Sequence, residues 1–179
     1  MHEFPTLFSK RLVLNQPVTD DIPVIVSLLN VEEFSKYTLT MPYPYLEKDA
    51  KFWFELAQKG FAQKNKFIFA IRQKNDPKII GGIDLSLNIK HNKGELGYWL
   101  GLPYWNKGYM TEAAKTVVQF GFGELGLKRI FASHFTSNPA SGRVMQKVGM
   151  QKEGVLKCYT KKGDVYQDHV VYGVINSLV

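Results

Sequence analysis

The sequence predicts an α+β fold in which a central mixed, mostly antiparallel sheet carries helices on both faces. Segments with strand-like alternation and segments with helical spacing of apolar residues follow one another in the order β-α-α-β-β-β-α-β-α-β-β. Three consecutive strands in the middle are joined by short polar turns, as in an antiparallel meander. The 179 residues, 45% of them hydrophobic, suit a single domain over residues 1–179 with a core of ordinary size.

The first third of the chain is expected to form one strand and two helices. Leucines alternate with other side chains over residues 10–16, which predicts a strand. Thr19 can cap a short helix whose first turn is acidic. Residues 31–44 are aromatic and interrupted by prolines, which indicates a loop or a broken helix, and residues 46–63 carry apolar side chains at helical spacing.

The remaining elements follow from alternation and from turn and cap residues. A long helix is expected to begin at Met110 and to end at Gly126. Asn138 and Pro139 are a typical N-cap and first residue of another helix, which Gly149 closes. Strands are expected at residues 67–72, 79–87, 95–100 and 129–134, followed by a hairpin of residues 156–160 and 165–174.

The composition argues against several classes of protein. No apolar run is long enough to span a bilayer and the N-terminus does not resemble an export signal, so we expect a cytoplasmic protein without a membrane partner. Cys158 is the only cysteine, which excludes an intrachain disulfide, and we expect it to be a small half-buried strand residue. The four histidines are not spaced as metal ligands, so no metal is expected.

The formal charge of +7 favours an anionic ligand. The lysines and arginines are spread along the chain and do not form a dense basic run with stacking aromatic residues, so direct nucleic-acid binding is not expected. A small molecule that carries phosphate is the better prediction.

Residues 94–125 are the stretch most suited to hold such a phosphate. They predict a strand, a polar turn with a glycine, and a long helix, and the first turn of a helix offers backbone N–H groups and a favourable dipole to an anion. Gly108 lets the backbone approach closely, Asn106 and Lys107 add a donor and a charge, and Thr111 can cap the helix or bind. Neither of the common glycine-rich nucleotide motifs is present.

The same stretch resembles the GNAT acetyltransferases. Residues 105–110 (WNKGYM) are similar to the acyl-CoA-binding motif [QR]-x-x-G-x-[GA] at its central glycine. Further segments resemble the RimJ/RimL branch of that family, and the resemblance covers nearly the whole chain: 94–100 (GELGYWL), 108–113 (GYMTEA), 138–141 (NPAS), 147–150 (KVGM), 153–154 (EG) and 163–168 (GDVYQD).

The resemblance implies the GNAT fold and acetyl-CoA (coenzyme A) as co-substrate. It places the pyrophosphate on the backbone N–H groups of the loop and of the first helical turn, formed by Asn106, Lys107, Gly108, Tyr109, Met110 and Thr111. It places the pantetheine arm along Leu100, Gly101 and Leu102, with Asn138 and Ser141 on the other side. For Asn138, a role as helix cap alone stays open.

The resemblance also raises the question of which groups move protons. Many relatives use a tyrosine as proton donor where this chain has Met145, so Ser141 is our candidate for contacting the thiol, with a plain surface serine as the alternative. The glutamate of some RimL-type enzymes falls on Thr160, which leaves Glu95 as the candidate base, acting through water, or as a structural carboxylate. A backbone N–H near Leu100 could polarise the carbonyl.

The favoured acceptor is the N-terminal α-amine of a ribosomal or other protein that starts with Ala or Ser, as the RimJ/RimL resemblance implies. An α-amine with a pKa of about 7.7–8.0 is partly neutral at pH 7, whereas a lysine near 10.4 requires roughly 4 kcal/mol to lose its proton. The sequence does not give the oligomeric state, and a homodimer stays open because dimers are common among relatives.

Two other readings stay open. Acidic residues near the aromatic loop (Glu32, Glu33, Glu47 and Asp49) would suit a small amine such as a polyamine, an aminoglycoside or an amino-acid derivative. The departures at the proton-transfer positions would suit a non-catalytic acyl-CoA-binding module.

Overall fold

A computed structural model describes residues 3–177, and within them one eight-stranded sheet has the order β1-β2-β3-β4-β5-β6-β8-β7. All neighbouring strands are antiparallel except β5 and β6, which are parallel. This confirms the predicted fold class. The strands are β1 (Leu7–Phe8), β2 (Leu12–Asn15), β3 (Lys66–Gln73), β4 (Asp76–Asn88), β5 (Lys93–Leu100), β6 (Arg129–Phe135), β7 (Gln151–Lys162) and β8 (Val165–Ile175).

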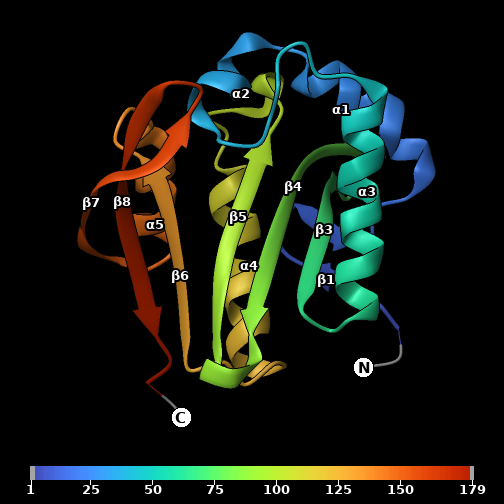
Figure 1. The fold of residues 1–179 in the computed structure, drawn as a ribbon. Coiled ribbons are helices and arrows are strands. Elements are labelled where there is room, and N and C mark those ends of the chain that lie inside the picture. The colour runs from blue at the N-terminus through green and yellow to red at the C-terminus, as the bar shows by residue number, and fades with distance from the viewer. Residues whose placement is uncertain (1–2, 178–179) are drawn as a thin grey trace.

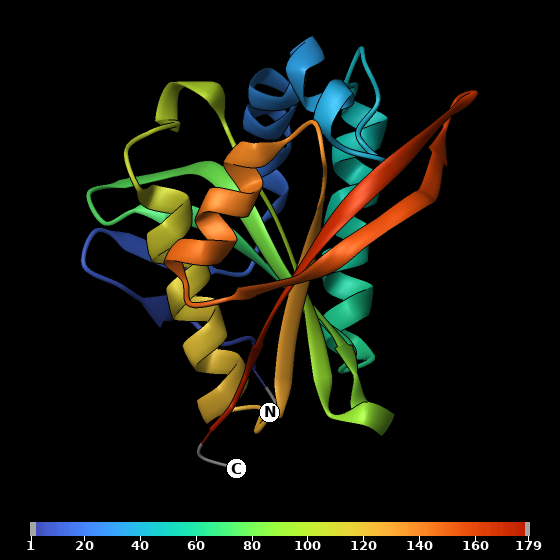
Figure 2. The same ribbon diagram turned by 90° about the vertical axis from the view of Figure 1, so that its left-hand side faces the viewer.

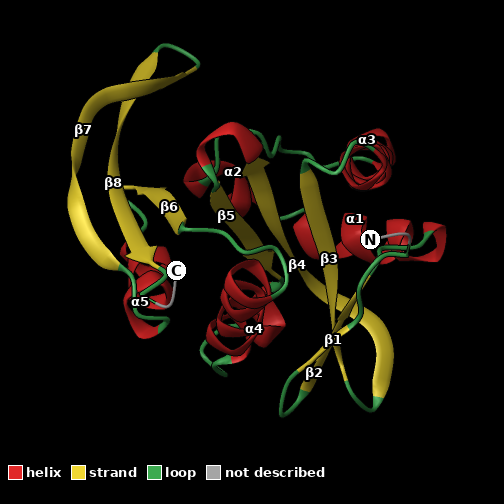
Figure 3. Ribbon diagram, turned by 90° about the horizontal axis from the view of Figure 1, so that it is seen from below, coloured by secondary structure: helices red, strands yellow, loops and turns green. Residues whose placement is uncertain are grey.

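Helices cover both faces of this sheet (Figure 3). On one face α4 and α5 pack on the larger apolar core, and on the other face α1 and α3 enclose a second core. The helices are α1 (Ile22–Leu29), α2 (Glu32–Tyr37), α3 (Glu47–Ala62), α4 (Tyr109–Gly123) and α5 (Pro139–Lys147). Short 3-10 turns occupy Thr19–Asp21, Ile89–His91 and Leu102–Tyr104. None of the helices in the described chain combines the length and apolar character needed to cross a bilayer.

The two parallel strands separate near the middle of the sheet. β5 and β6 pair only at Lys93–Arg129, Gly94–Ile130 and Glu95–Phe131, and beyond this point they diverge (Figure 1). The side chains and backbone groups of both strands therefore border a gap in the sheet. The candidate active site lies at this gap.

The last two strands form a long two-stranded arm that leaves the body of the molecule (Figure 2). At its far end, Lys162 Nζ donates a hydrogen bond of 2.7 Å to the carbonyl oxygen of Thr38, just after α2. The arm therefore reaches across the molecule to the end of α2.

A short helix, α2, lies within the segment expected to be a loop or broken helix. Three other details differ from the sequence-based expectations. β1 is a strand of two residues and is too short to show alternation. β7 begins at Gln151, earlier than predicted, because an edge strand with both faces mostly exposed lacks an apolar pattern. Cys158 is exposed rather than half-buried, since the β7–β8 register shifts here and its φ is +49°.

A buried ion pair fastens the first helix to the sheet. The Nη1 and Nη2 atoms of Arg72 on β3 donate bonds of 2.7 Å to the two carboxylate oxygens of Asp21. Arg72 Nε also donates to the Asn15 side chain at 2.9 Å, and Asp21 accepts a bond from the Val18 amide at 2.9 Å. Both charged groups are therefore hydrogen-bonded inside the protein.

Candidate active site

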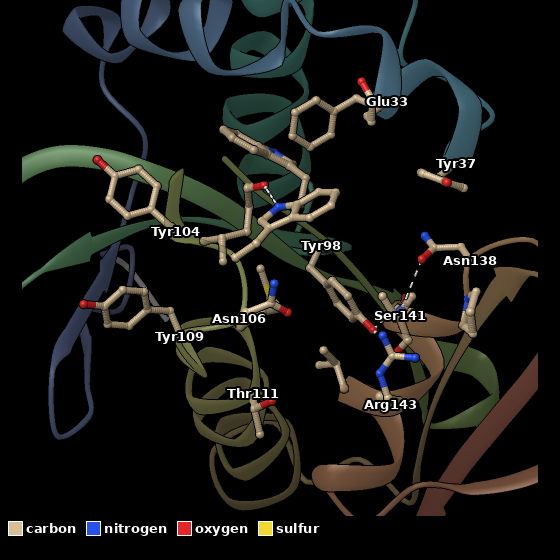
Figure 4. A pocket seen from close by; sticks show the side chains of 18 of the residues that line it. Glu33, Tyr37, Tyr98, Tyr104, Asn106, Tyr109, Thr111, Asn138, Ser141 and Arg143 are labelled. Atoms are coloured by element: carbon tan, nitrogen blue, oxygen red, sulfur yellow. Dashed lines mark hydrogen bonds between the residues drawn. The ribbon is translucent and has the colours of Figure 1, made fainter. Parts of the chain in front are cut away.

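A cavity of about 550 Å³ opens where β5 and β6 diverge (Figure 4). Such a volume lies within the range of small-molecule sites. Its walls come from β5, the loop before α4, the first turn of α4, the loop after β6, α5 and α2. Of the predicted site residues, eight line it: Leu100, Asn106, Gly108, Tyr109, Met110, Thr111, Asn138 and Ser141.

The turn before α4 presents backbone amides to this cavity. Gly108 is the N-cap of α4 in the left-handed conformation, with φ +77°, and it offers no side-chain cap. The N–H groups of the first helical turn therefore have no partner within the helix and can bind an anion. The turn is held in place by Arg11, whose Nη1 donates to the carbonyl oxygen of Lys107 at 3.0 Å and whose Nε donates to Glu112 at 2.7 Å.

The end of β5 presents a further amide to the gap. The Gly101 amide donates to the Ile80 carbonyl oxygen on β4 at 2.9 Å. Because N–H groups of successive residues point to opposite sides of a strand, the Leu100 N–H points toward the gap. The carbonyl oxygen of Leu100 accepts a bond of 2.5 Å from the Trp105 indole, which fixes this strand end.

Three of the predicted cofactor-binding residues do not line the cavity, namely Gly101, Leu102 and Lys107. A Cβ at Gly101 would lie 2.8 Å from Leu28 Cδ2, so this glycine allows α1 to approach the strand end. The Lys107 ammonium lies 5.9 Å from the centre of the Tyr104 ring. Cofactor binding by these three residues stays a prediction.

The start of α5 forms the opposite wall. The Asn138 side chain accepts a hydrogen bond of 3.3 Å from the Ser141 amide, so it caps the helix as predicted while lining the cavity. The Tyr98 hydroxyl lies 2.8 Å from the Ser141 hydroxyl and 3.0 Å from the Ser141 carbonyl oxygen, and its single proton can be donated to either of them. Burial raises the pKa of Tyr98 to about 12, so this phenol stays protonated at neutral pH.

Sequence reasoning assigned no role to Tyr98 or to Arg143, which both line the cavity. Tyr98 lies on the same face of β5 as the core residues Leu96 and Leu100, and this alternation is the signal that could have found it. Figure 4 shows Arg143 beside Ser141, far from Glu33 on α2. Met145, which stands where the resemblance implied a proton-donor tyrosine, is buried in the core with 2% of its surface exposed.

Glu95 lies apart from this constellation. It lines a second cavity of about 270 Å³ on the other face of β5, together with Lys93, Arg129, Phe131 and Ser133. Desolvation and then the Asp84 carboxylate raise the pKa of Glu95, while Lys66 and Lys93 oppose them. Its Cα lies five residues from that of Leu100, roughly 16 Å along the strand. Its role as a base through water stays a prediction.

Comparison with known proteins identifies the family. The family model described as "Acetyltransferase (GNAT) domain" matches residues 11–151. The chain belongs to the GNAT acetyltransferase family. Across residues 3–177 the structure contains no group of three or more His, Cys, Asp or Glu side chains placed to hold a metal ion. Membership of the GNAT family makes the protein an N-acetyltransferase with acetyl-CoA as co-substrate, which confirms the predicted enzyme class and co-substrate.

Individual relatives of this GNAT enzyme are similar in sequence and fold. The uncharacterized N-acetyltransferase YoaA of Bacillus subtilis (strain 168) is 32% identical over 173 residues, 96% of this chain and 97% of that protein. The ribosomal protein uS5-alanine N-acetyltransferase of Escherichia coli (strain K12) is 28% identical over 111 residues, 61% of this chain and 57% of that protein. The structure of RimL, a ribosomal L7/L12 α-N-protein acetyltransferase in complex with coenzyme A, has a TM-score of 0.86 at 16% identity and covers 96% of this chain and 98% of that chain.

The conformation of Gly108 predicts how the acetyl-CoA loop responds to substitution. We expect Gly108→Val to raise the KM for acetyl-CoA roughly five- to thirtyfold, because a side chain disfavours the left-handed conformation by about 1–2 kcal/mol and the amides would turn away. Steady-state kinetics at varied acetyl-CoA would measure this. Gly126→Val is the matched control, since Gly126 has φ +61° with open space around it beyond α4. An unchanged KM in folded Gly108→Val would refute the assignment.

Proposed function

We propose that this enzyme acetylates the N-terminal α-amine of proteins, including ribosomal proteins, that start with Ala or Ser. The observation that carries the proposal is the charge of the cavity. Among the described residues that line it, Glu33 is the one carboxylate. An α-amine is already partly neutral at pH 7 and requires little help to lose its proton. The similarity to the uS5-alanine N-acetyltransferase supports the same choice.

The acidic cluster near α2 and α3 does not favour a polycationic acceptor. Glu32 and Glu33 lie 3.4 and 3.9 Å from the Lys36 ammonium, and Glu47 lies 2.6 Å from that of Lys51. Asp49 accepts a bond of 2.8 Å from the Leu46 amide and so caps the start of α3. Because three of the four carboxylates do not line the cavity, they cannot form an acidic wall for a polyamine.

The reaction is a direct transfer in which the amine attacks the thioester carbonyl of acetyl-CoA. The amides of Gly108 to Thr111 bind the pyrophosphate, and the Leu100 N–H donates to the carbonyl oxygen as it gains charge. When the Tyr98 hydroxyl donates its proton to Ser141 Oγ, at 2.8 Å, the Ser141 hydroxyl keeps its own proton to donate to the departing sulfur. Glu95 is the carboxylate candidate for the base, through water.

A panel of acceptors tests the proposal. Acetyl-CoA is mixed with peptides that start with Ala or Ser, with the same peptides blocked at the N-terminus but containing lysine, and with spermidine and an aminoglycoside. We expect thiol release with the free Ala and Ser peptides, and mass spectrometry should place the acetyl group on the α-amine.

The other outcomes identify the alternatives. Turnover of the blocked lysine peptides only would refute the choice of the α-amine. Turnover of spermidine or the aminoglycoside only would assign a small-molecule acceptor. Tight coenzyme A binding with no turnover of any amine would identify a non-catalytic module.

A further inference from the structure

The turn between β1 and β2 brings an arginine against the loop before α4. Arg11 directly precedes β2, and its Nη1 donates a bond of 3.0 Å to the carbonyl oxygen of Lys107, the residue before the glycine turn. A Cβ built at Gly108 would lie 3.5 Å from Arg11 Nη2. Arg11 is not among the residues that line the cavity. Its guanidinium therefore supports the glycine turn from outside the cavity.

The same side chain is bound to a carboxylate in the first turn of α4. Arg11 Nε donates to Glu112 Oε2 at 2.7 Å, and the Arg11 backbone amide donates to Oε1 at 2.6 Å. The Ser9 hydroxyl also donates to Oε1, at 2.8 Å. The Arg11 side chain therefore bridges Lys107 and Glu112, the two residues that flank the backbone amides at 108–111.

Arg11 also packs on the first residue of α4. Its Cζ lies 4.5 Å from the centre of the Tyr109 ring, which is a cation–π contact. The Tyr109 hydroxyl accepts a bond of 2.8 Å from the Gln73 side chain on β3. Tyr109 itself lines the cavity. The first turn of α4 is thus held to the neighbouring strands at a carbonyl oxygen, a carboxylate and an aromatic ring.

The charge of Glu112 makes its place in this turn informative. Desolvation raises the pKa of Glu112, but hydrogen bonds from the Arg11 amide, the Ser9 hydroxyl and the Arg11 guanidinium outweigh it and hold the pKa below its usual value. The side chain is therefore ionised at neutral pH, and it is only 17% exposed. A negative charge one residue beyond amides that bind a pyrophosphate repels that ligand. Its contribution to the site must then come from what it holds in place.

We propose that Arg11 and Glu112 together position the acetyl-CoA loop, Arg11 by fixing the amides at 108–111 in their binding conformation and Glu112 by fixing Arg11. Both are positioning residues, which act through the loop and do not contact the co-substrate. A turn that is ordered before the ligand arrives loses less conformational entropy on binding. The inference rests on the proposed placement of the pyrophosphate on these amides. It extends the acetyl-CoA site to the turn between β1 and β2.

Coenzyme A binding tests the inference without any acceptor amine. We expect Arg11→Met to raise the Kd for coenzyme A about tenfold in isothermal titration calorimetry, because the turn must then be ordered on binding. The KM for acetyl-CoA should rise by a similar factor, whereas kcat at saturating acetyl-CoA should stay within about twofold of wild type. The Arg11 side chain is 43% exposed, so the melting temperature should change by only a few degrees.

Glu112→Ala separates positioning from charge, because the two roles predict opposite signs. If Arg11 acted through its positive charge alone, loss of the nearby carboxylate would tighten coenzyme A binding. We expect Glu112→Ala to weaken binding about as much as Arg11→Met. The double variant should bind no more weakly than the weaker single variant, because each change already breaks the same arrangement.

A conservative variant and a matched control complete the set. Arg11→Lys keeps the charge but lacks the rigid fork that bonds to two partners, so it should restore little of the lost affinity. Lys10→Met removes one positive charge at the neighbouring exposed residue and should leave the Kd within about twofold of wild type.

Three results would overturn the proposal: an unchanged Kd in folded Arg11→Met, tighter binding by Glu112→Ala, or full recovery in Arg11→Lys. Gly108→Val shows which part has failed. If it raises the KM for acetyl-CoA while Arg11→Met does not, the positioning role alone is refuted. If neither variant changes the KM, the pyrophosphate does not lie on these amides.

Discussion

Replacing Asp21 with alanine is expected to lower the free energy of unfolding by about 3–5 kcal/mol. The substitution would leave the Arg72 guanidinium without its carboxylate partner, and the Arg72 side chain is only 9% exposed. An unpaired charge that cannot reach water is among the largest single-site penalties in a protein. For a chain of this size the melting temperature should fall by roughly 6–20 °C, measurable by thermal or urea unfolding.

Two further variants separate the buried charge from a general effect of substitution. Asp164→Ala removes the partner of Lys161 at the exposed tip of the arm and should change stability by less than about 1 kcal/mol. Asp21→Leu combined with Arg72→Met removes both charges and should recover much of the loss, because an apolar pair avoids desolvation. A loss below 1 kcal/mol in Asp21→Ala would contradict the buried pair.

The sequence was most informative where function depends on local backbone geometry. A strand, a glycine turn and a helix start follow one another within residues 94–125, so the phosphate-binding amides could be located without knowledge of the tertiary fold. Gly108 adopts the positive φ that its residue type suggests, and Asn138 caps α5 through its side chain. Such features depend on neighbours in sequence, which a single chain displays directly.

Polar contacts between side chains of different strands depend instead on the tertiary fold. Ser133, Thr160 and His169 meet because β8 pairs with β6 on one side and β7 on the other, and no local pattern specifies that order. Tyr98 has the alternation of a core residue, and only the docking of α5 gives its hydroxyl a partner at Ser141. The β7–β8 register also shifts between Leu156 and Thr160, so the alternation of side chains along β7 does not predict which β8 residue lies opposite Thr160.

Replacing Tyr98 with phenylalanine is expected to lower kcat on the order of a hundredfold with little change in the KM for acetyl-CoA. Phenylalanine preserves the ring and removes the hydroxyl that lies 2.8 Å from Ser141 Oγ. With a pKa of about 12 the phenol does not ionise during turnover, so its contribution is to orient the Ser141 hydroxyl toward the sulfur. Loss of one oriented donor to developing charge typically costs about 10²–10³ in kcat.

A double-mutant cycle shows whether the two hydroxyls act as one unit. Ser141→Ala should lower kcat by a similar factor, and Tyr98→Phe combined with Ser141→Ala should be no slower than the slower single variant, because each change already breaks the same arrangement. Steady-state kinetics of the four proteins gives the coupling. Independent, multiplicative losses would mean that Tyr98 acts on the reaction separately from Ser141. Near-wild-type kcat in Tyr98→Phe would reduce the phenol to a packing residue, and Ser141 would then require another group to orient its hydroxyl.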